Sequence, residues 1–179
     1  MYITEKCKGY VMSDQEGLTL VFIRHGEKFS EGVDRLTSKG KFEVLSTAQQ
    51  LKCKMNLWPD VILSSPTKRT MDSARLVQRA FEEGKQPEIQ ETELLVEGSR
   101  GKFTLEGKGF AGLDGNHKTV FCVTHNNVIQ SQFQALADGY PFIDYGIALV
   151  MKFNEKSWAE ITRDTKPKSV AVVVPEARQ

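Results

Sequence analysis

The stretch Leu18-Thr19-Leu20-Val21-Phe22-Ile23-Arg24-His25-Gly26 decides the fold of this chain. Its first six residues are mostly apolar and rich in strand-forming types, which indicates a strand buried on both faces of a covered sheet. The apolar run stops at Arg24, and the residues that follow are largely polar. The sequence therefore predicts a buried strand that delivers Arg24 and His25 to one edge of a sheet.

Two further apolar runs predict buried strands, and helical spacing of apolar residues marks the segments around them. We expect these strands at 61–63 and 119–124, and helices at 38–55, at 66–83 and directly after His125. Ser65 is expected to cap the second helix, with Pro66 as its first residue. Alternating strands and helices predict an α/β fold, a three-layer sandwich with a mainly parallel, Rossmann-like central sheet.

The C-terminal half of the chain is less regular. A short strand is expected near Ile89, and the glycine-rich residues up to 118 are expected to form loops. The apolar runs 147–153 and 158–162 predict a β-hairpin, whose exposed edge could pair with a second copy of the chain. The apolar cluster 170–174 is either an added edge strand or not part of the sheet.

Composition argues against several classes of protein. The 179 residues include 24 Lys and Arg and 23 Asp and Glu, with no long basic block, which disfavours a nucleic-acid binder. No apolar run approaches the roughly 18 residues that span a bilayer, and residues 1–17 lack the apolar core of a secretory signal. Three widely spaced cysteines suit neither a disulfide framework nor a zinc site. We therefore expect a cytoplasmic protein with no nucleic-acid or membrane partner.

Unusual polar residues follow all three buried strands. In parallel sheets, ligands bind outside the carboxyl ends of the strands, so Arg24, His25 and His125 should meet there, joined by Arg69 from the second helix. Guanidinium groups suit phosphate oxygens, and a neutral imidazole is a competent nucleophile toward phosphorus. Gly26 would let the backbone approach a bound phosphate, and the helix start near Pro66 would add a positive dipole.

Four segments, in this order along the chain, resemble the histidine phosphatase superfamily, which contains the cofactor-dependent phosphoglycerate mutases. They are Leu20-Val21-Phe22-Ile23-Arg24-His25-Gly26-Glu27, Leu36-Thr37-Ser38-Lys39-Gly40, Ser64-Ser65-Pro66-Thr67-Lys68-Arg69-Thr70-Met71-Asp72-Ser73-Ala74 and Val123-Thr124-His125. The resemblance covers residues 18–163, which we expect to form a histidine phosphatase domain of phosphoglycerate mutase-like fold. Residues 1–17 would then be an N-terminal extension and 164–179 a C-terminal tail.

The resemblance implies a role for each candidate residue. His25 would be the nucleophile that becomes phosphohistidine, and Arg24, Arg69 and His125 would bind the phosphoryl group. The segment 95–101 resembles a family segment that carries the general acid, which nominates Glu97. The implied enzyme is a metal-independent hydrolase that needs no cofactor, and its partner is a phosphorylated substrate.

Three features depart from the family pattern. Glu31 stands where many members carry a phosphate-binding Asn, and Asn126-Asn127 replace a Gly-Gly pair. Asn tolerates left-handed backbone, so the turn after His125 could survive. The segment between Glu97 and His125 is short, which resembles the lidless bacterial phosphohistidine phosphatases and disfavours a mutase, because a mutase must keep water from its phosphoenzyme.

Several alternatives remain open at this point. Glu31 and Asn126 keep open a non-catalytic module that recognises phosphorylated partners, and a phosphoglycerate-type mutase is the weaker rival. Glu27 is expected to orient the loop after His25, and His117 to be a surface histidine. A metal site built from the three histidines is not expected, because the nearby arginines would repel a cation. A phosphoprotein, a sugar phosphate or a nucleotide would suit the site equally, and the oligomeric state is undetermined.

Overall fold

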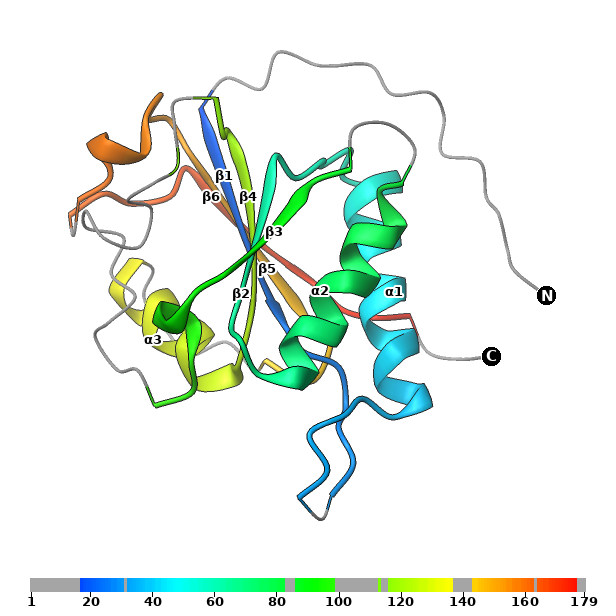
Figure 1. The fold of residues 1–179 in the computed structure, drawn as a ribbon. Helices are drawn as coiled ribbons and strands as arrows, with labels where there is room; N and C mark the ends of the chain where they lie inside the picture. The colour runs from blue at the N-terminus through cyan, green and yellow to red at the C-terminus, as the bar shows by residue number, and fades with distance from the viewer. Residues whose placement is uncertain are drawn as a thin grey trace.

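The computed structural model describes residues 17–30, 32–82, 86–98, 113, 116–136, 143–162 and 164–176. In this part of the chain, a six-stranded sheet in the order β3-β2-β4-β1-β5-β6 lies between two layers of helices (Figure 1). The strands are β1 (Leu18–Arg24), β2 (Val61–Ser64), β3 (Glu88–Glu91), β4 (Thr119–Thr124), β5 (Ala148–Phe153) and β6 (Ser169–Val173). The helices are α1 (Ser38–Cys53), α2 (Lys68–Ala80) and α3 (Asn126–Leu136), with the 3₁₀ turns η1 (Glu93–Leu95) and η2 (Trp158–Glu160).

The sheet is mainly parallel, as the alternation of strands and helices predicts. β1 to β4 run parallel to one another, and β5 is antiparallel to both of its neighbours, β1 and β6. Helices α1 and α2 cover one face and α3 covers the other (Figure 1). The α/β three-layer sandwich is therefore confirmed.

Strand β1 lies in the middle of the sheet and faces a hydrophobic core on each side. Val21 and Ile23 pack into the core beneath α1 and α2, while Leu20 and Phe22 pack into the core on the α3 side. All four side chains are fully buried. A register slip of one residue would exchange these two sets of side chains and disturb the packing of both cores.

The predicted hairpin of 147–153 with 158–162 is wrong. β5 pairs instead with β6, in a register that places Lys152 opposite Ser169 and Ala148 opposite Val173. Residues 158–160 form η2, and Trp158 is buried in the core on the α3 side. The apolar residues of 158–162 fit a buried 3₁₀ turn as well as a strand, because Trp158 fills the core. The edge strand next to β5 is formed by the apolar cluster at 170–174 instead.

The second helix begins later than predicted. α2 starts at Lys68 with Thr67 at its N-cap position, not at Pro66 after Ser65. The backbone N–H of Ser65 donates to the Val123 carbonyl at 3.1 Å, so the chain is still paired with β4 at this position. The hydroxyl of Ser65 contacts the His125 ring and does not cap the helix.

Part of the predicted C-terminal tail belongs to the sheet, because β6 lies within 164–179. The division of the chain at residues 17 and 163 remains a prediction, and residues 1–16 lie outside the described ranges. Of the helices described, none is long and apolar enough to cross a bilayer.

Candidate active site

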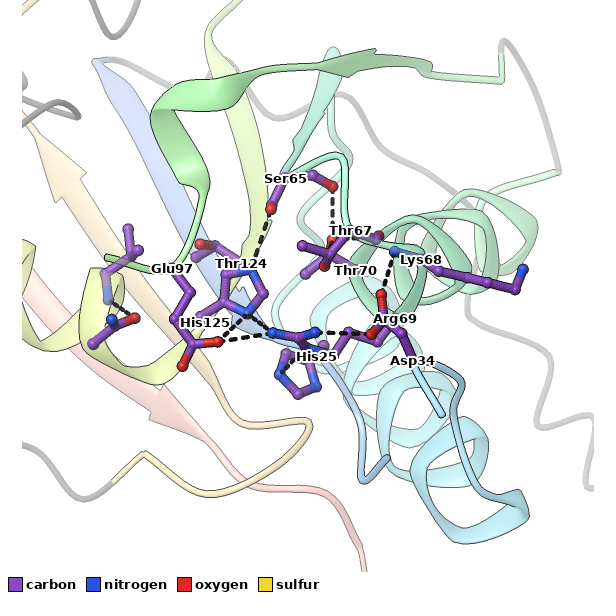
Figure 2. A network of polar contacts seen from close by, with 12 residues as sticks. His25, Asp34, Ser65, Thr67, Lys68, Arg69, Thr70, Glu97, Thr124 and His125 are labelled. Carbon is purple, nitrogen blue, oxygen red and sulfur yellow. Dashed lines mark hydrogen bonds and ion pairs between the residues drawn. The ribbon is translucent and has the colours of Figure 1, made fainter. Parts of the chain in front are cut away.

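The carboxyl ends of β1, β4 and β2 lie next to one another in the sheet, and the predicted site residues gather there. The rings of His25, after β1, and His125, after β4, have centroids 5.3 Å apart. Arg69 lies in the first turn of α2 and extends its guanidinium between these rings and Glu97 (Figure 2). The structure thus brings together residues that are about 100 positions apart in the sequence.

The contacts of His25 assign its tautomer. Its Nδ1 lies 2.8 Å from the Gly26 carbonyl oxygen, and because a carbonyl can only accept, Nδ1 carries the hydrogen. Nε2 therefore holds a lone pair, which accepts a hydrogen bond of 3.2 Å from Nε of Arg69. The Nε2 lone pair of His25 thus points toward the guanidinium that would hold an anion.

His25 is neutral over most of the pH range. The side chain is buried, with 4% of its surface exposed. This desolvation lowers the pKa of His25 to about 4, and the neighbouring His125 and Arg69 favour the neutral ring as well, against the opposing effect of the Gly26 carbonyl. A neutral imidazole retains the lone pair that a nucleophile needs.

Arg69 is the hub of the polar network. Besides Nε, its Nη1 donates to Asp34 at 2.8 Å and its Nη2 donates to Glu97 at 2.8 Å, with His125 Nδ1 at 3.3 Å. These contacts fix the plane of the guanidinium relative to His25. A planar fork held in this way presents its donors to tetrahedral oxyanions in a defined orientation.

His125 is held in the opposite tautomer. Arginine only donates, so Nδ1 of His125 accepts from Arg69 and the hydrogen is on Nε2, which donates to the Ser65 hydroxyl at 3.1 Å. Only 1% of the residue is exposed. Desolvation, followed by the charge of Arg69, lowers the pKa of His125 to about 4 despite the opposing charge of Asp34.

Arg24 reaches the site from the last residue of β1. Its Nη1 donates to the Ile143 carbonyl at 2.7 Å and lies 3.9 Å from Asp144 Oδ1, and its guanidinium carbon lies 4.0 Å above the ring of Tyr145. Its Nε is buried and has no hydrogen-bond partner among the described residues. An unsatisfied buried donor on a cation is suited to an anion that enters the site.

Glu97 lies at the outer side of the site, just after η1. Its Oε2 is 2.8 Å from Arg69 Nη2 and 3.9 Å from His125 Nδ1, and 59% of its side chain is exposed. The segment that carries it is anchored to the sheet, because the Thr124 hydroxyl donates to the Leu95 carbonyl at 2.7 Å. Glu97 therefore lies beside Arg69 and His125 on the solvent-exposed side of the site.

Gly26 also lies in a close contact between two backbone segments, while its expected approach to a bound phosphate stays a prediction. A Cβ at this position would lie 2.0 Å from the carbonyl oxygen of Gly40, and a Cβ on Gly40 would lie 2.1 Å from the carbonyl oxygen of Glu27. The two glycines let the loop after β1 pack directly against the first turn of α1. Gly26 thus positions the His25 loop through helix packing.

The loop after His25 is held by Glu27, as expected. The Glu27 carboxylate accepts from the Thr37 hydroxyl at 2.9 Å and from Lys39 Nζ at 2.8 Å. Its backbone N–H donates to Glu43 at 2.9 Å. These contacts tie the loop to the N-terminal half of α1.

Three site residues were missed by the sequence analysis. The sequence predicts a helix cap at Ser65, but its hydroxyl accepts a hydrogen bond from His125, and only its position at a strand end indicates the site. Asp34 contacts Arg69 across two loops, and Tyr145 packs against both Arg24 and the ring of His25. No spacing in the sequence relates Asp34 or Tyr145 to the strand ends.

Two positions depart from the family pattern, Glu31 and the pair Asn126-Asn127, and the structure describes only the second. Glu31 lies outside the described residues. Asn126 and Asn127 form the first turn of α3, so the backbone there is helical and needs no left-handed residue. Among the described residues, no group of three or more His, Cys, Asp or Glu side chains is placed to hold a metal ion.

No family model and no curated protein matches the sequence, but solved structures match the fold. A proposed phosphohistidine phosphatase, SixA, from Nakamurella multipartitia is 19% identical, with a TM-score of 0.69 over 90% of this chain and 98% of that chain. A protein histidine phosphatase SixA complexed with tungstate is 17% identical, with a TM-score of 0.61 over 76% of this chain and 89% of that chain. A phosphoglycerate mutase from Plasmodium falciparum is 18% identical, with a TM-score of 0.53 and 89% coverage of both chains. The chain therefore has the fold of the phosphoglycerate mutase-like proteins, SixA among them.

Proposed function

We propose that this protein is a metal-independent phosphatase that acts through a phosphohistidine intermediate on His25. The observation that carries the proposal is the state of the His25 ring. Its Nδ1 is bound to the Gly26 carbonyl, so an unprotonated Nε2 faces the guanidinium of Arg69 at 3.2 Å. A phosphate held by Arg69 would lie beside a nucleophile that is ready to attack.

The first chemical step transfers the phosphoryl group to the protein. Nε2 of His25 attacks phosphorus as the bond between phosphorus and the leaving oxygen breaks, and the leaving oxygen takes a proton from the carboxyl group of Glu97. In the second step, water attacks phosphorus, the P–N bond breaks, and Glu97 accepts a proton from that water. The products are the dephosphorylated substrate and inorganic phosphate.

Positioning and charge stabilisation should provide most of the rate enhancement, because phosphoryl transfer leaves little covalent work for the protein. Arg24 and Arg69 carry the positive charges and donate to the phosphoryl oxygens, while Nδ1 of His125 holds Arg69 in place. Removal of one such donor should reduce the rate on the order of a hundredfold or more. The exposed position of Glu97 suits a proton donor that must meet the leaving group of an incoming substrate.

The substrate class that we favour is a phosphorylated protein. The solved structures with the same fold include a protein histidine phosphatase. Phe29 and Val33 are exposed on the loop that carries Asp34, where they could pack against a protein surface. A cytoplasmic location and the absence of nucleic-acid and membrane partners remain predictions.

The test is turnover by a His25→Gln variant. We expect this variant to lose all measurable hydrolysis of a generic aryl phosphate and of phosphohistidine-containing proteins while its thermal unfolding remains cooperative. His117→Gln is the matched control, because it removes another histidine that lies outside the network, and it should retain full activity. Unchanged turnover by His25→Gln would refute the mechanism.

The same substrate panel separates the rival functions. Binding of phosphate without turnover of any phosphomonoester or phosphohistidine would favour a recognition module. Isomerisation of a phosphoglycerate, stimulated by a bisphosphate primer, would favour a mutase.

A further inference from the structure

Asp34 occupies a position that the proposed reaction does not assign. It lies on the loop between β1 and α1, whose two arms are held together where Lys28 bridges Leu36 and where the Phe29 N–H donates to the Arg35 carbonyl at 3.1 Å. The loop therefore holds Asp34 beside the first turn of α2 (Figure 2).

The two carboxylate oxygens of Asp34 have separate partners. Oδ1 accepts from Nη1 of Arg69 at 2.8 Å, and Oδ2 accepts from the backbone N–H of Lys68 at 2.9 Å. The carboxylate of Asp34 thus fixes the guanidinium of Arg69 and also the first turn of α2, which carries Arg69.

The Asp34 carboxylate caps the N-terminus of α2 from a different segment of the chain. Thr67 is at the N-cap position, but its side chain caps no backbone N–H, and its hydroxyl lies 2.7 Å from that of Thr70. The first N–H groups of a helix need acceptors, and a carboxylate there also interacts favourably with the helix dipole. The positive helix end that we expected to face the phosphate is therefore occupied by Asp34.

Charge at Asp34 is stabilised by the same partners. Burial by itself would raise the pKa of its carboxyl group, but the hydrogen bond and charge of Arg69 and the N–H groups at the helix start lower that pKa overall. Asp34 is therefore ionised when Arg69 is in place, and the pair is a charge-assisted contact.

We propose that Asp34 is a positioning residue for phosphoryl transfer, which holds the Arg69 guanidinium in the plane that fits the transition state. The inference rests on the proposed function. It has a specific kinetic consequence, because Asp34 also cancels one positive charge near the phosphate. Loss of Asp34 frees the guanidinium and at the same time makes the pocket more positive, so binding of ground-state phosphate should be kept while stabilisation of the transition state is lost.

The test compares Asp34→Asn with Asp72→Asn. Asp72 lies on the same helix and pairs with Arg75 at 3.3 Å and Lys68 at 3.5 Å, so its replacement removes an equal charge away from the site. For Asp34→Asn we expect kcat to fall about ten- to a hundredfold with KM unchanged or lower, since misplacement of a catalytic group by about 1 Å can cost a hundredfold. Asp72→Asn should leave both constants unchanged.

Inhibitor binding distinguishes positioning from a purely structural role. Vanadate, whose trigonal form resembles the transferring phosphoryl group, should bind Asp34→Asn about tenfold or more weakly, whereas inorganic phosphate should bind as tightly as before. In an Arg69→Lys background, which lacks the guanidinium fork, Asp34→Asn should have little further effect on kcat/KM. A fall in kcat that leaves vanadate binding unchanged, or an equal loss in the Arg69→Lys background, would overturn the positioning role.

The outcomes for the two proposals are separable. If the wild-type protein hydrolyses phosphate esters and Asp34→Asn matches it in kcat and vanadate affinity, the role of Asp34 is refuted and the proposed function stands. If the wild-type protein binds vanadate but hydrolyses nothing, the proposed function fails, and the role of Asp34 in phosphoryl transfer fails with it. If the wild-type protein binds no vanadate, both proposals fail.

Discussion

At the scale of single residues, two buried imidazole rings, those of His25 and His125, are neutral in the site. Desolvation and the nearby arginines lower the pKa of both His25 and His125 to about 4. Each ring also has one nitrogen bound to a partner that fixes its tautomer, the Gly26 carbonyl for His25 and Arg69 for His125. The fold thus holds two neutral imidazole rings next to the cationic side chain of Arg69.

This neutrality predicts that the protein loses stability in mild acid. An imidazole in the unfolded chain binds a proton near its usual pKa of about 6.5, while the folded rings do not until about pH 4. The unfolded state therefore binds more protons below pH 6.5, and the free energy of unfolding should fall by up to about 4 kcal/mol for the pair between pH 7.5 and pH 5.

Denaturant unfolding at several pH values measures this change. Asp34 and Glu27, whose pKa values are lowered, lose their stabilising charge only in stronger acid, so the range from pH 5 to 7.5 isolates the histidines. A double variant, His25→Gln with His125→Gln, should show a much flatter dependence over this range. An equally steep fall in the double variant would show that the two rings are not its cause.

The individual site residues differ in how far the sequence could predict them. His25, Arg24 and His125 were predictable because each follows a buried strand, and parallel strands bring their carboxyl ends to one edge. Asp34 was not predictable, because its contact with Arg69 depends on how the loop between β1 and α1 folds against α2.

At the scale of elements, the junction of the β1 loop with α1 positions His25. Gly26 and Gly40 allow backbone-to-backbone contact, with a Cβ on Gly40 placed 2.1 Å from the Glu27 carbonyl oxygen. Although alanine is favoured over glycine inside a helix, Gly40→Ala should lower the free energy of unfolding by about 2 kcal/mol, because the overpacked contact forces the loop to move.

Lys41→Ala is the matched control for this junction, since Lys41 is an exposed residue of the same helix turn. It should change stability by less than about 0.5 kcal/mol. Chemical denaturation of the two variants measures the difference. A Gly40→Ala protein at least as stable as the wild type would contradict the close contact.

The sequence predicts a strand correctly where its own apolar pattern is sufficient. It does not predict which of two segments pairs with a given strand. The run 18–23 predicts β1 because it is apolar on both faces. The run 158–162 is also apolar at intervals, but Trp158 fills the core on the α3 side, and β5 pairs with β6. The spacing of apolar residues indicates which residues are buried, but it does not indicate which segment pairs with β5.

At the scale of the whole molecule, β6 completes the sheet and the core beneath α1 and α2. Val173 has 8% of its surface exposed and belongs to that core, while Val172, its neighbour on the strand, is 48% exposed. Val173→Ala should lower the free energy of unfolding by about 2 kcal/mol, because two buried methyl-sized groups are lost.

Val172→Ala in the same strand should change stability by less than about 0.5 kcal/mol. The pair of variants therefore tests whether the end of the chain is part of the cooperative fold. Equal effects of the two substitutions would show that β6 does not pack as described.

The central claim, that Nε2 of His25 carries the phosphoryl group, is tested most directly by trapping the intermediate. The protein is mixed with a good phosphoryl donor and quenched in base, where phosphohistidine is stable, and the modified residue is identified by peptide mass spectrometry and ³¹P NMR. We predict one phosphoryl group on Nε2 of His25, present in His117→Gln and absent in His25→Gln. A phosphoryl group on any other residue, or on Nδ1 of His25, would contradict the account.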